Sequence, residues 1–103
     1  MRMMLRATMP VDTGNAAISD GSLQTKVQKI LADLKPEAAY FIEENGQRTA
    51  LIFFDMKDSS ELPAVAEPWF LAFNASLTVK PAMNPQDLAA AAPGMERARS
   101  AIC

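Results

Sequence analysis

Two β-rich runs joined by a tight turn decide the fold of this 103-residue chain: residues 38–56 read AAYFIEENGQRTALIFFDM. Asn45 and Gly46 lie between the runs, and both residue types readily adopt the positive φ angles that a two-residue type I′ turn requires. Such a turn sets Glu44 opposite Gln47 and thereby fixes the register of the whole antiparallel pair.

The register divides the hairpin between two faces of a sheet, because successive side chains of a strand point to opposite sides. One face carries Ala39, Phe41, Ile52 and Phe54, and the other carries Ala38, Tyr40, Ile42, Leu51 and Phe53. An antiparallel hairpin with one wet face alternates apolar with polar residues, so two apolar faces predict that something covers each of them. The same register predicts a weak cross-strand ion pair between Glu43 and Arg48.

The residues before the hairpin predict a strand and then a helix. Residues 1–9 alternate, which indicates a strand with one wholly apolar face and two arginines on the other. Residues 10–15 have the composition of a turn, and apolar positions recur at helical spacing over residues 23–34. Ser22 is the expected N-cap of this helix, and residues 35–36 (Lys-Pro) are its expected end.

The residues after the hairpin repeat this order. Asp58 opens a helix-start signal that runs to Glu61, and apolar positions at helical spacing follow over residues 62–73. Pro68 lies inside that helix, where its missing N–H and its ring predict a kink or a break. Residues 76–83 indicate the last strand.

The C-terminal residues predict one more helix. Asn84 is a typical N-cap, and the proline that follows it suits the first helical position. An alanine-rich run begins at Leu88, and the Pro-Gly pair at residues 93–94 is expected to end it. Residues 95–103 are expected to form a short helix or a frayed end.

The order β-α-β-β-α-β with a C-terminal helix predicts an α+β, ferredoxin-like sandwich in which residues 1–103 form a single domain. Its antiparallel four-stranded sheet has the strand order 4-1-3-2, and two helices cover one face. The cleaner apolar face is the expected covered one: Met3, Leu5, Ala7, Ala39, Phe41, Ile52, Phe54, Leu77 and Val79. The opposite face mixes large apolar side chains with charges.

Composition excludes several classes of function. A formal charge of -2 argues against nucleic acid as a partner. The chain has no histidine, which excludes imidazole catalysis, His-ligated zinc and His-ligated haem. Its one cysteine, Cys103, excludes an intramolecular disulfide or a thiolate cluster. We therefore expect no metal site and no cofactor.

The sequence pattern predicts neither a signal peptide nor a membrane-spanning helix. Arg2 and Arg6 interrupt the N-terminal apolar run that a signal peptide needs. No window reaches the 18 or so consecutive apolar residues of a membrane helix. The expected compartment is the cytoplasm, without a membrane partner.

Four short segments carry a resemblance to a known family: residues 35–41, 53–56, 67–70 and 85–88, which read KPEAAYF, FFDM, EPWF and PQDL. The chain resembles a group of short uncharacterised bacterial proteins of the dimeric α+β barrel superfamily. The resemblance implies a homodimer in which two ferredoxin-like subunits pack sheet to sheet around a cavity. The superfamily includes cofactor-free monooxygenases, isomerases, dehydratases and haem enzymes, several of which use a histidine that this chain lacks.

The face away from the helices is the expected site. Cations and hydroxyls beside apolar walls are typical of a pocket for a small, partly apolar anion. The expected ligand-binding residues are the polar Arg6, Thr78 and Lys80 and the apolar Met4, Leu51 and Phe53. In this interpretation Arg6 or Lys80 holds a carboxylate of the ligand.

Two alternatives remain beside this binding interpretation. The first is a cofactor-independent isomerase or monooxygenase in which Tyr40 or Asp55 transfers a proton. Against it, Tyr40 suits a packing position, and Asp55 is more simply paired with Arg2 or Lys80 at the end of the sheet. The second alternative is a structural or regulatory dimer without a ligand.

Overall fold

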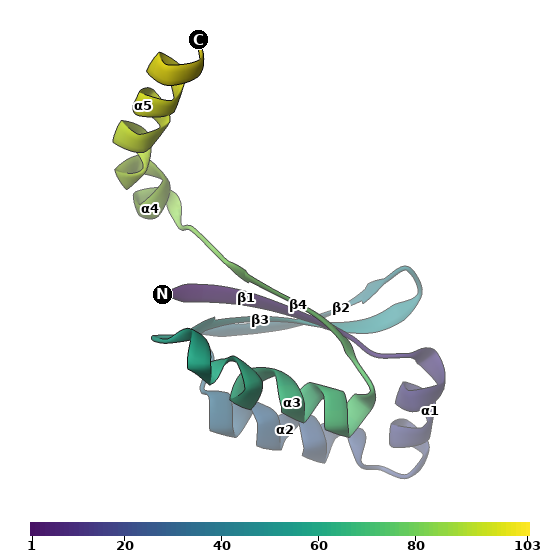
Figure 1. Cartoon of the computed structure of the whole chain (residues 1–103). Helices are drawn as coiled ribbons and strands as arrows, with labels where there is room; N and C mark the ends of the chain where they lie inside the picture. The colour runs from purple at the N-terminus through teal and green to yellow at the C-terminus, as the bar shows by residue number, and fades with distance from the viewer.

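Four antiparallel strands form one sheet in the order β2-β3-β1-β4, in a computed structural model that describes residues 1–103 (Figure 1). This α+β arrangement confirms the predicted ferredoxin-like topology and strand order. The strands are β1 (Arg2–Thr8), β2 (Ala38–Glu44), β3 (Gln47–Asp55) and β4 (Ser76–Pro81).

The β2-β3 hairpin has the predicted turn and register. Asn45 and Gly46 both have positive φ angles, 53° and 78°, and Glu44 lies opposite Gln47. The same register runs to Ala38, which lies opposite Phe53. The local turn chemistry therefore sets which side chains reach each face of the sheet.

The predicted ion pair between Glu43 and Arg48 is wrong, although the two residues lie opposite each other. The Glu43 carboxylate accepts a hydrogen bond from the Gly46 backbone N–H at 2.9 Å. Arg48 instead extends to a neighbouring helix, where its Nη2 donates to Asn15 Oδ1 at 3.1 Å. Each group thus satisfies a local backbone or amide partner in place of the exposed pair, which is weak in water.

Two helices cover one face of the sheet: α2 (Leu23–Leu34) and α3 (Leu62–Phe73). The segment before α3 is a 3₁₀ turn, η1 (Ser59–Glu61), held by a reciprocal capping box between Asp58 and Glu61. Of the two outcomes expected at Pro68, a kink or a break, the break does not occur, since α3 continues through it. The missing N–H frees only the carbonyl of residue 64, which lies on the exposed side of the helix, where water is available as a donor.

A further helix occupies the segment that was expected to be a turn. Residues 10–15 do not form a loop, because α1 (Val11–Ser19) begins directly after Pro10. Gly21, with φ 78°, separates α1 from α2. Ser22 does take the N-cap position of α2, but its side chain makes no capping hydrogen bond. As predicted, α2 ends at the Lys-Pro step, and Lys35 has the left-handed conformation of a C-cap.

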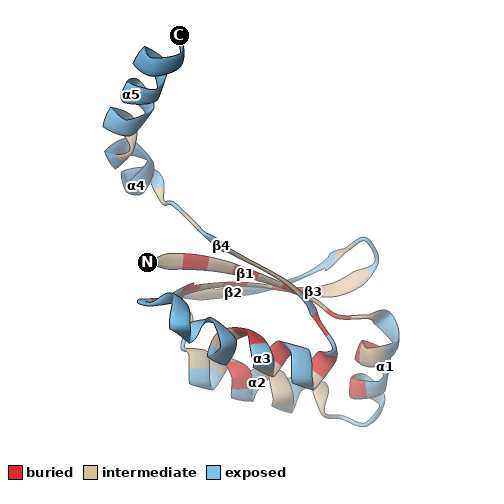
Figure 2. Cartoon of the chain, viewed as in Figure 1, coloured by how far each residue is buried: buried red, intermediate tan, exposed pale blue.

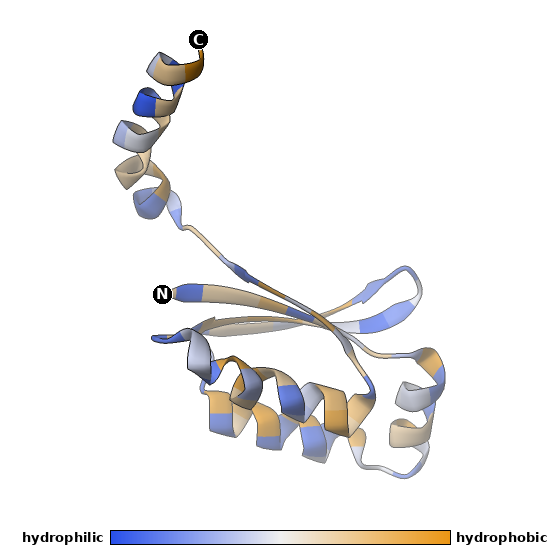
Figure 3. Ribbon diagram, viewed as in Figure 1, coloured by the Kyte–Doolittle hydropathy of each residue, from blue (hydrophilic) through white to orange (hydrophobic).

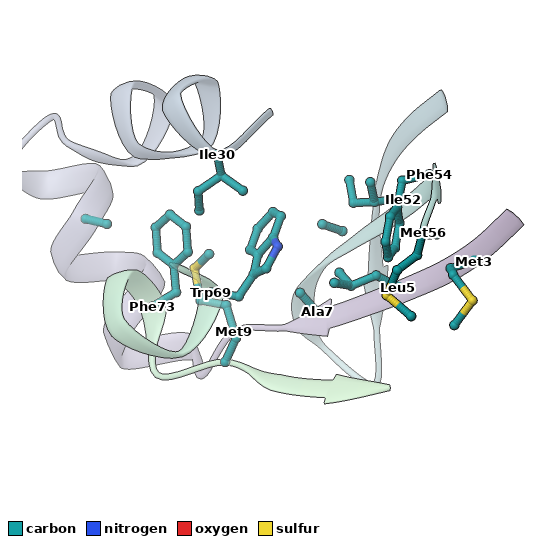
Figure 4. Close-up of a cluster of buried hydrophobic side chains, with 13 residues drawn as sticks. Met3, Leu5, Ala7, Met9, Ile30, Ile52, Phe54, Met56, Trp69 and Phe73 are labelled. Carbon is teal, nitrogen blue, oxygen red and sulfur yellow. The ribbon is translucent and has the colours of Figure 1, made fainter. Parts of the chain in front are cut away.

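The core lies between the sheet and the two covering helices (Figures 2 and 4). Leu5 and Ile52, paired across β1 and β3, have no exposed surface. Phe54, Trp69 and Phe73 complete the set of large, fully buried side chains. Burying groups of this size against each other is what holds the helices on the sheet.

The C-terminal residues form an arm that points away from the rest of the molecule (Figure 1). It comprises α4 (Pro85–Ala90) and α5 (Ala92–Ile102). Pro93 and Gly94 do not stop the helix as expected, because they lie in the first turn of α5, where a proline is tolerated. The radius of gyration is 17.0 Å, against about 13 Å for a compact chain of this length. None of the helices is both long and apolar enough to span a membrane.

Candidate functional site

The face of the sheet away from α2 and α3, here called the open face, carries all six predicted ligand-binding residues. Backbone pairing across β2, β3, β1 and β4 arranges its central side chains in three four-residue rows: Ala38, Phe53, Met4 and Lys80; Tyr40, Leu51, Arg6 and Thr78; and Ile42, Thr49, Thr8 and Ser76. Arg2 and Asp55 lie beyond the first row, and Glu44 and Gln47 lie beyond the third. The half over β2 and β3 is mainly apolar, and the half over β1 and β4 bears hydroxyls and cations. The open face is therefore amphipathic from one edge of the sheet to the other.

The cations of the open face differ in their partners. Arg6 Nη1 lies 3.4 Å from Glu44 Oε1, and both side chains are little more than a third exposed. Thr78 is the backbone partner of Arg6 on β4. A polar hollow of about 310 Å³ adjoins them, lined by Arg6, Thr8, Glu44, Asn45, Gln47, Ser76, Leu77 and Thr78. Lys80 is exposed and makes no ion pair, so it is the cation of this face that is free for an external anion.

Asp55 was expected to pair with Arg2 or Lys80, but it pairs with neither. Its carboxylate accepts a hydrogen bond from the Met1 ammonium at 2.7 Å, and this contact lowers the pKa of the Asp55 carboxyl below its ordinary value. Arg2 instead binds the carboxylate of Glu37, and this hydrogen bond raises the pKa of the Arg2 guanidinium. Asp55 and Arg2 are thus each paired within the chain, with other groups than expected.

The two candidates for proton transfer are not brought together. Tyr40 lies opposite Leu51, and Asp55 lies four positions further along β3, a separation of about 13 Å along the strand. The Tyr40 side chain is 59% exposed and its hydroxyl makes no hydrogen bond to the protein. Without a shared partner or a sheltered position, the pair does not form an acid–base site in one subunit.

An apolar pocket that the sequence pattern did not predict lies on the other face of the sheet. It has a volume of about 360 Å³ and lies between the hairpin end of the sheet and the helices α2 and α3. On the sheet its floor includes Ala7 and Ala50, which are paired directly across β1 and β3. The next pair along, Leu5 and Ile52, fills the core completely. The pocket exists because two alanines stand where the neighbouring row has two large side chains.

The walls of this pocket come from the helices and from the edge strand. Leu23 and Val27 of α2 and Trp69 and Phe73 of α3 face the alanine floor, with the two aromatic ring centroids 6.0 Å apart. Phe41 was expected to be covered, but it is 58% exposed, because β2 is the edge strand and the helices pack over the central strands. A matched pair of small residues in the predicted register was the signal that could have revealed the pocket.

The Trp69 indole nitrogen is buried without a hydrogen-bond partner. In Figure 4 it points toward the sheet, on the side of the ring away from Phe73. The nitrogen has almost no accessible surface, so it takes no part in recognition at the mouth of the pocket.

Comparison with known proteins supports the fold alone. No protein-family model and no curated sequence matches the chain. Its structure is similar to part of a formyltetrahydrofolate deformylase from Pseudomonas putida KT2440, with a TM-score of 0.50 and 13% sequence identity. The match covers 80% of this chain and 29% of the deformylase chain, so the present chain spans less than a third of that protein.

Proposed function

We propose that the chain works as a homodimer whose two open faces pack together and enclose a cavity for a small, partly apolar anion, in the cytoplasm. The observation that carries this proposal is the open face itself, on which large apolar side chains of β2 and β3 lie without a covering element. Tyr40 and Ile42 are 59% and 41% exposed, beside the half-buried Leu51 and Phe53. Contiguous apolar patches of this kind mark interaction sites.

The amphipathic pattern of the open face favours a second copy as its partner. A two-fold axis places identical patches against each other. The apolar halves over β2 and β3 then exclude water, while Lys80 and Thr78 of the polar half remain beside the enclosed space. A cation and a hydroxyl in a largely apolar cavity suit a small carboxylate. The resemblance to the dimeric α+β barrel proteins supports the same arrangement.

The C-terminal arm supports a dimer on grounds of area. Strand spacing and rise give the open face a flat area of about 450 Å², less than the roughly 800 Å² per partner of a stable interface. The arm extends from the sheet on the side opposite α2 and α3 (Figure 1). Leu88, Met95 and Ile102 along it are 51%, 53% and 85% exposed, and the tip of the arm is hydrophobic (Figure 3). Packing of the arm against the partner supplies the missing area.

Sedimentation velocity with matched variants tests the dimer. Leu51→Glu places a charge at the centre of the open face and is expected to yield monomers. Leu71→Glu introduces the same charge at a position of α3 that is 81% exposed and is expected to leave the dimer intact. A monomeric wild-type protein, or a dimer that persists in Leu51→Glu, would contradict the proposal.

Native mass spectrometry of freshly purified protein tests the ligand. The expected result is a dimer that releases a defined small acid on denaturation. Lys80→Gln is expected to lose this mass while remaining dimeric, and Lys57→Gln, at an exposed position just beyond β3, serves as the control. An empty dimer in every preparation would favour the structural or regulatory dimer, and ligand retention in Lys80→Gln would remove that lysine from the site.

The geometry favours binding over the isomerase or monooxygenase alternative. Asp55 is engaged by the Met1 ammonium, which stabilises the carboxylate and makes it a weak proton acceptor. Tyr40 lies distant from it on the same face. A carboxylate of low pKa and a separate exposed phenol do not supply the matched acid and base that proton transfer requires.

A further inference from the structure

The apolar pocket beneath α2 and α3 is a second site, distinct from the open face. We propose that it binds the apolar body of a small monocarboxylate, a short acyl chain or a single ring, with the carboxylate held at the mouth by Arg48. This proposal does not depend on the dimer, since every residue that lines the pocket belongs to one subunit.

The pocket is built to hold an apolar body. Ten of its thirteen lining residues are hydrophobic. Its volume of about 360 Å³ lies at the small end of the roughly 300–1,000 Å³ range of ligand pockets. The occupant is therefore small, and an apolar surface placed between the alanine floor and the Trp69 and Phe73 rings gains favourable burial.

Arg48 provides the charge that selects an acid. Its guanidinium contacts only neutral acceptors, Asn15 Oδ1 at 3.1 Å and the Val11 carbonyl at 3.5 Å, and it has no carboxylate within ion-pair distance. Arg2, Arg6 and Arg99 each have an acidic partner. An arginine at the mouth of an apolar pocket without an acidic partner is positioned to bind a carboxylate from outside.

One acidic residue also lines the pocket. The Glu43 carboxylate forms no ion pair with Arg48 and is held in the turn by a hydrogen bond from the Gly46 N–H at 2.9 Å. On the helix side, Lys26 Nζ lies 5.9 Å from the centroid of the Phe73 ring, which is part of the pocket wall.

The backbone makes room for Arg48 in this position. Gly14 is buried in α1, and a Cβ atom there would lie 2.5 Å from Arg48 Nη1 and 3.2 Å from its Cδ. Only glycine lets the arginine side chain lie against α1 beside the pocket that it lines. The same Cβ would lie 3.0 Å from Met9 Sδ, which also lines the pocket. Both clashes fall on the ends of flexible side chains, so Gly14→Ala is expected to move Arg48 and Met9 and leave the fold in place.

Trp69 reports binding directly, because it is the only tryptophan of the chain and lines the pocket. Titration of the full chain with octanoate is expected to change the Trp69 emission saturably. Octan-1-ol has the same chain length without the charge, and it is expected to bind about tenfold more weakly, the equivalent of one charge-assisted hydrogen bond. No saturable change with either compound would overturn the proposal.

Variants that fill the pocket separate a specific site from general apolar adsorption. Ala50→Leu is expected to abolish the octanoate response, whereas Ala32→Leu adds the same side chain on the exposed side of α2 and should bind as the wild type does. Ala7→Val is a milder filling variant, and circular dichroism checks that each variant is folded. If neither filling variant folds, the ¹³C methyl shifts of Ala7 and Ala50 in the wild-type protein decide: octanoate moves them if the proposal holds.

Arg48→Gln tests the charge. It is expected to weaken octanoate binding about tenfold and to leave octan-1-ol binding unchanged. Gly14→Ala is expected to act in the same direction by displacing the guanidinium. Octanoate binding that is equal in the wild type and in Arg48→Gln, or that persists in Ala50→Leu, would show that this pocket does not hold the acid.

Discussion

The two faces of the sheet are formed by alternate residues of the same strands, but their side chains differ greatly in burial. On the covered face Leu5 and Ile52 have no exposed surface, whereas Leu51, the neighbour of Ile52 along β3, remains half-buried on the open face. Both faces are rich in large apolar side chains, so hydrophobicity does not distinguish them. The connections do: both helical crossovers of this topology have the same hand and place α2 and α3 on the same side.

The covered face is not uniform either. Its middle row packs Leu5 against Ile52, and its row at the hairpin end pairs Ala7 with Ala50 under the same two helices. The difference of two side chains separates a filled core from a pocket of about 360 Å³. Rows of the same face thus differ as much as the two faces do.

The largest expected effect is on the covered face. Leu5→Ala removes a fully buried side chain and is expected to lower the free energy of unfolding by about 3 kcal/mol, through lost burial and the cavity left behind. Leu51→Ala on the open face is expected to cost about 1 kcal/mol. Urea unfolding at one fixed protein concentration measures both, and equal losses would contradict the contrast between the faces.

The next effect concerns association through the open face. Removal of residues 84–103 takes away the arm and its exposed apolar side chains, and it is expected to raise the dimer dissociation constant about tenfold, or 1.4 kcal/mol. The domain itself should keep its circular dichroism spectrum, because the arm packs against little of it. Sedimentation equilibrium gives the constant. A truncated protein that dimerises as tightly as the full chain would exclude the arm from the interface.

A smaller effect is expected at the turn that assigns residues to the faces. Gly46→Ala places a side chain at φ 78°, and the strain is expected to lower the free energy of unfolding by about 1 kcal/mol. Gly94 has no positive φ and lies in helix α5, so Gly94→Ala is the matched control and should cost nothing. Thermal and urea unfolding report the difference, and equal effects of the two alanines would show that the turn does not constrain the register.

The smallest expected effect is the contribution of Asp55, at the end of the sheet, to the pH dependence of stability. The pKa of Asp55 in the folded protein is lowered from 3.8 by the Met1 ammonium. A lowered folded-state pKa stabilises the protein above the unfolded value, and this contribution disappears as the pH falls through the folded value. As the pH falls below about 4, the free energy of unfolding should therefore decline less steeply in Asp55→Asn than in the wild type. Identical pH profiles would exclude the ammonium contact as a source of stability.

Much of the fold could be predicted because its signals are local. The Asn45-Gly46 turn, the alternation in the strands and the capping box at Asp58 each depend on residues within a few positions. The helix α1 was missed because Pro10, Asp12 and Gly14 resemble a loop when they are considered without their surroundings. In the structure Pro10 precedes the helix, and Gly14 accommodates the side chain of Arg48.

For the open face as well, local signals predicted the positions of the residues, but the sequence did not predict their long-range contacts. The members of the open face followed from strand order and register, so all six binding residues were placed on one surface. The partners of the charged residues at the end of the sheet did not follow, because Arg2 and Asp55 meet groups far away in the sequence, at Glu37 and at Met1. Long side chains reach many neighbours, and only packing selects among them.

By itself, the sequence determined the strand order, the hairpin register, the division of residues between the two faces and the face that the helices cover, because turn residues and periodicity act over short distances. Only the tertiary structure decided that Arg48 leaves Glu43 for α1 and that a pocket opens above Ala7 and Ala50. These outcomes depend on how far α2 and α3 extend over the sheet and on which side chains meet there. Both are properties of packing between elements that lie far apart in the chain.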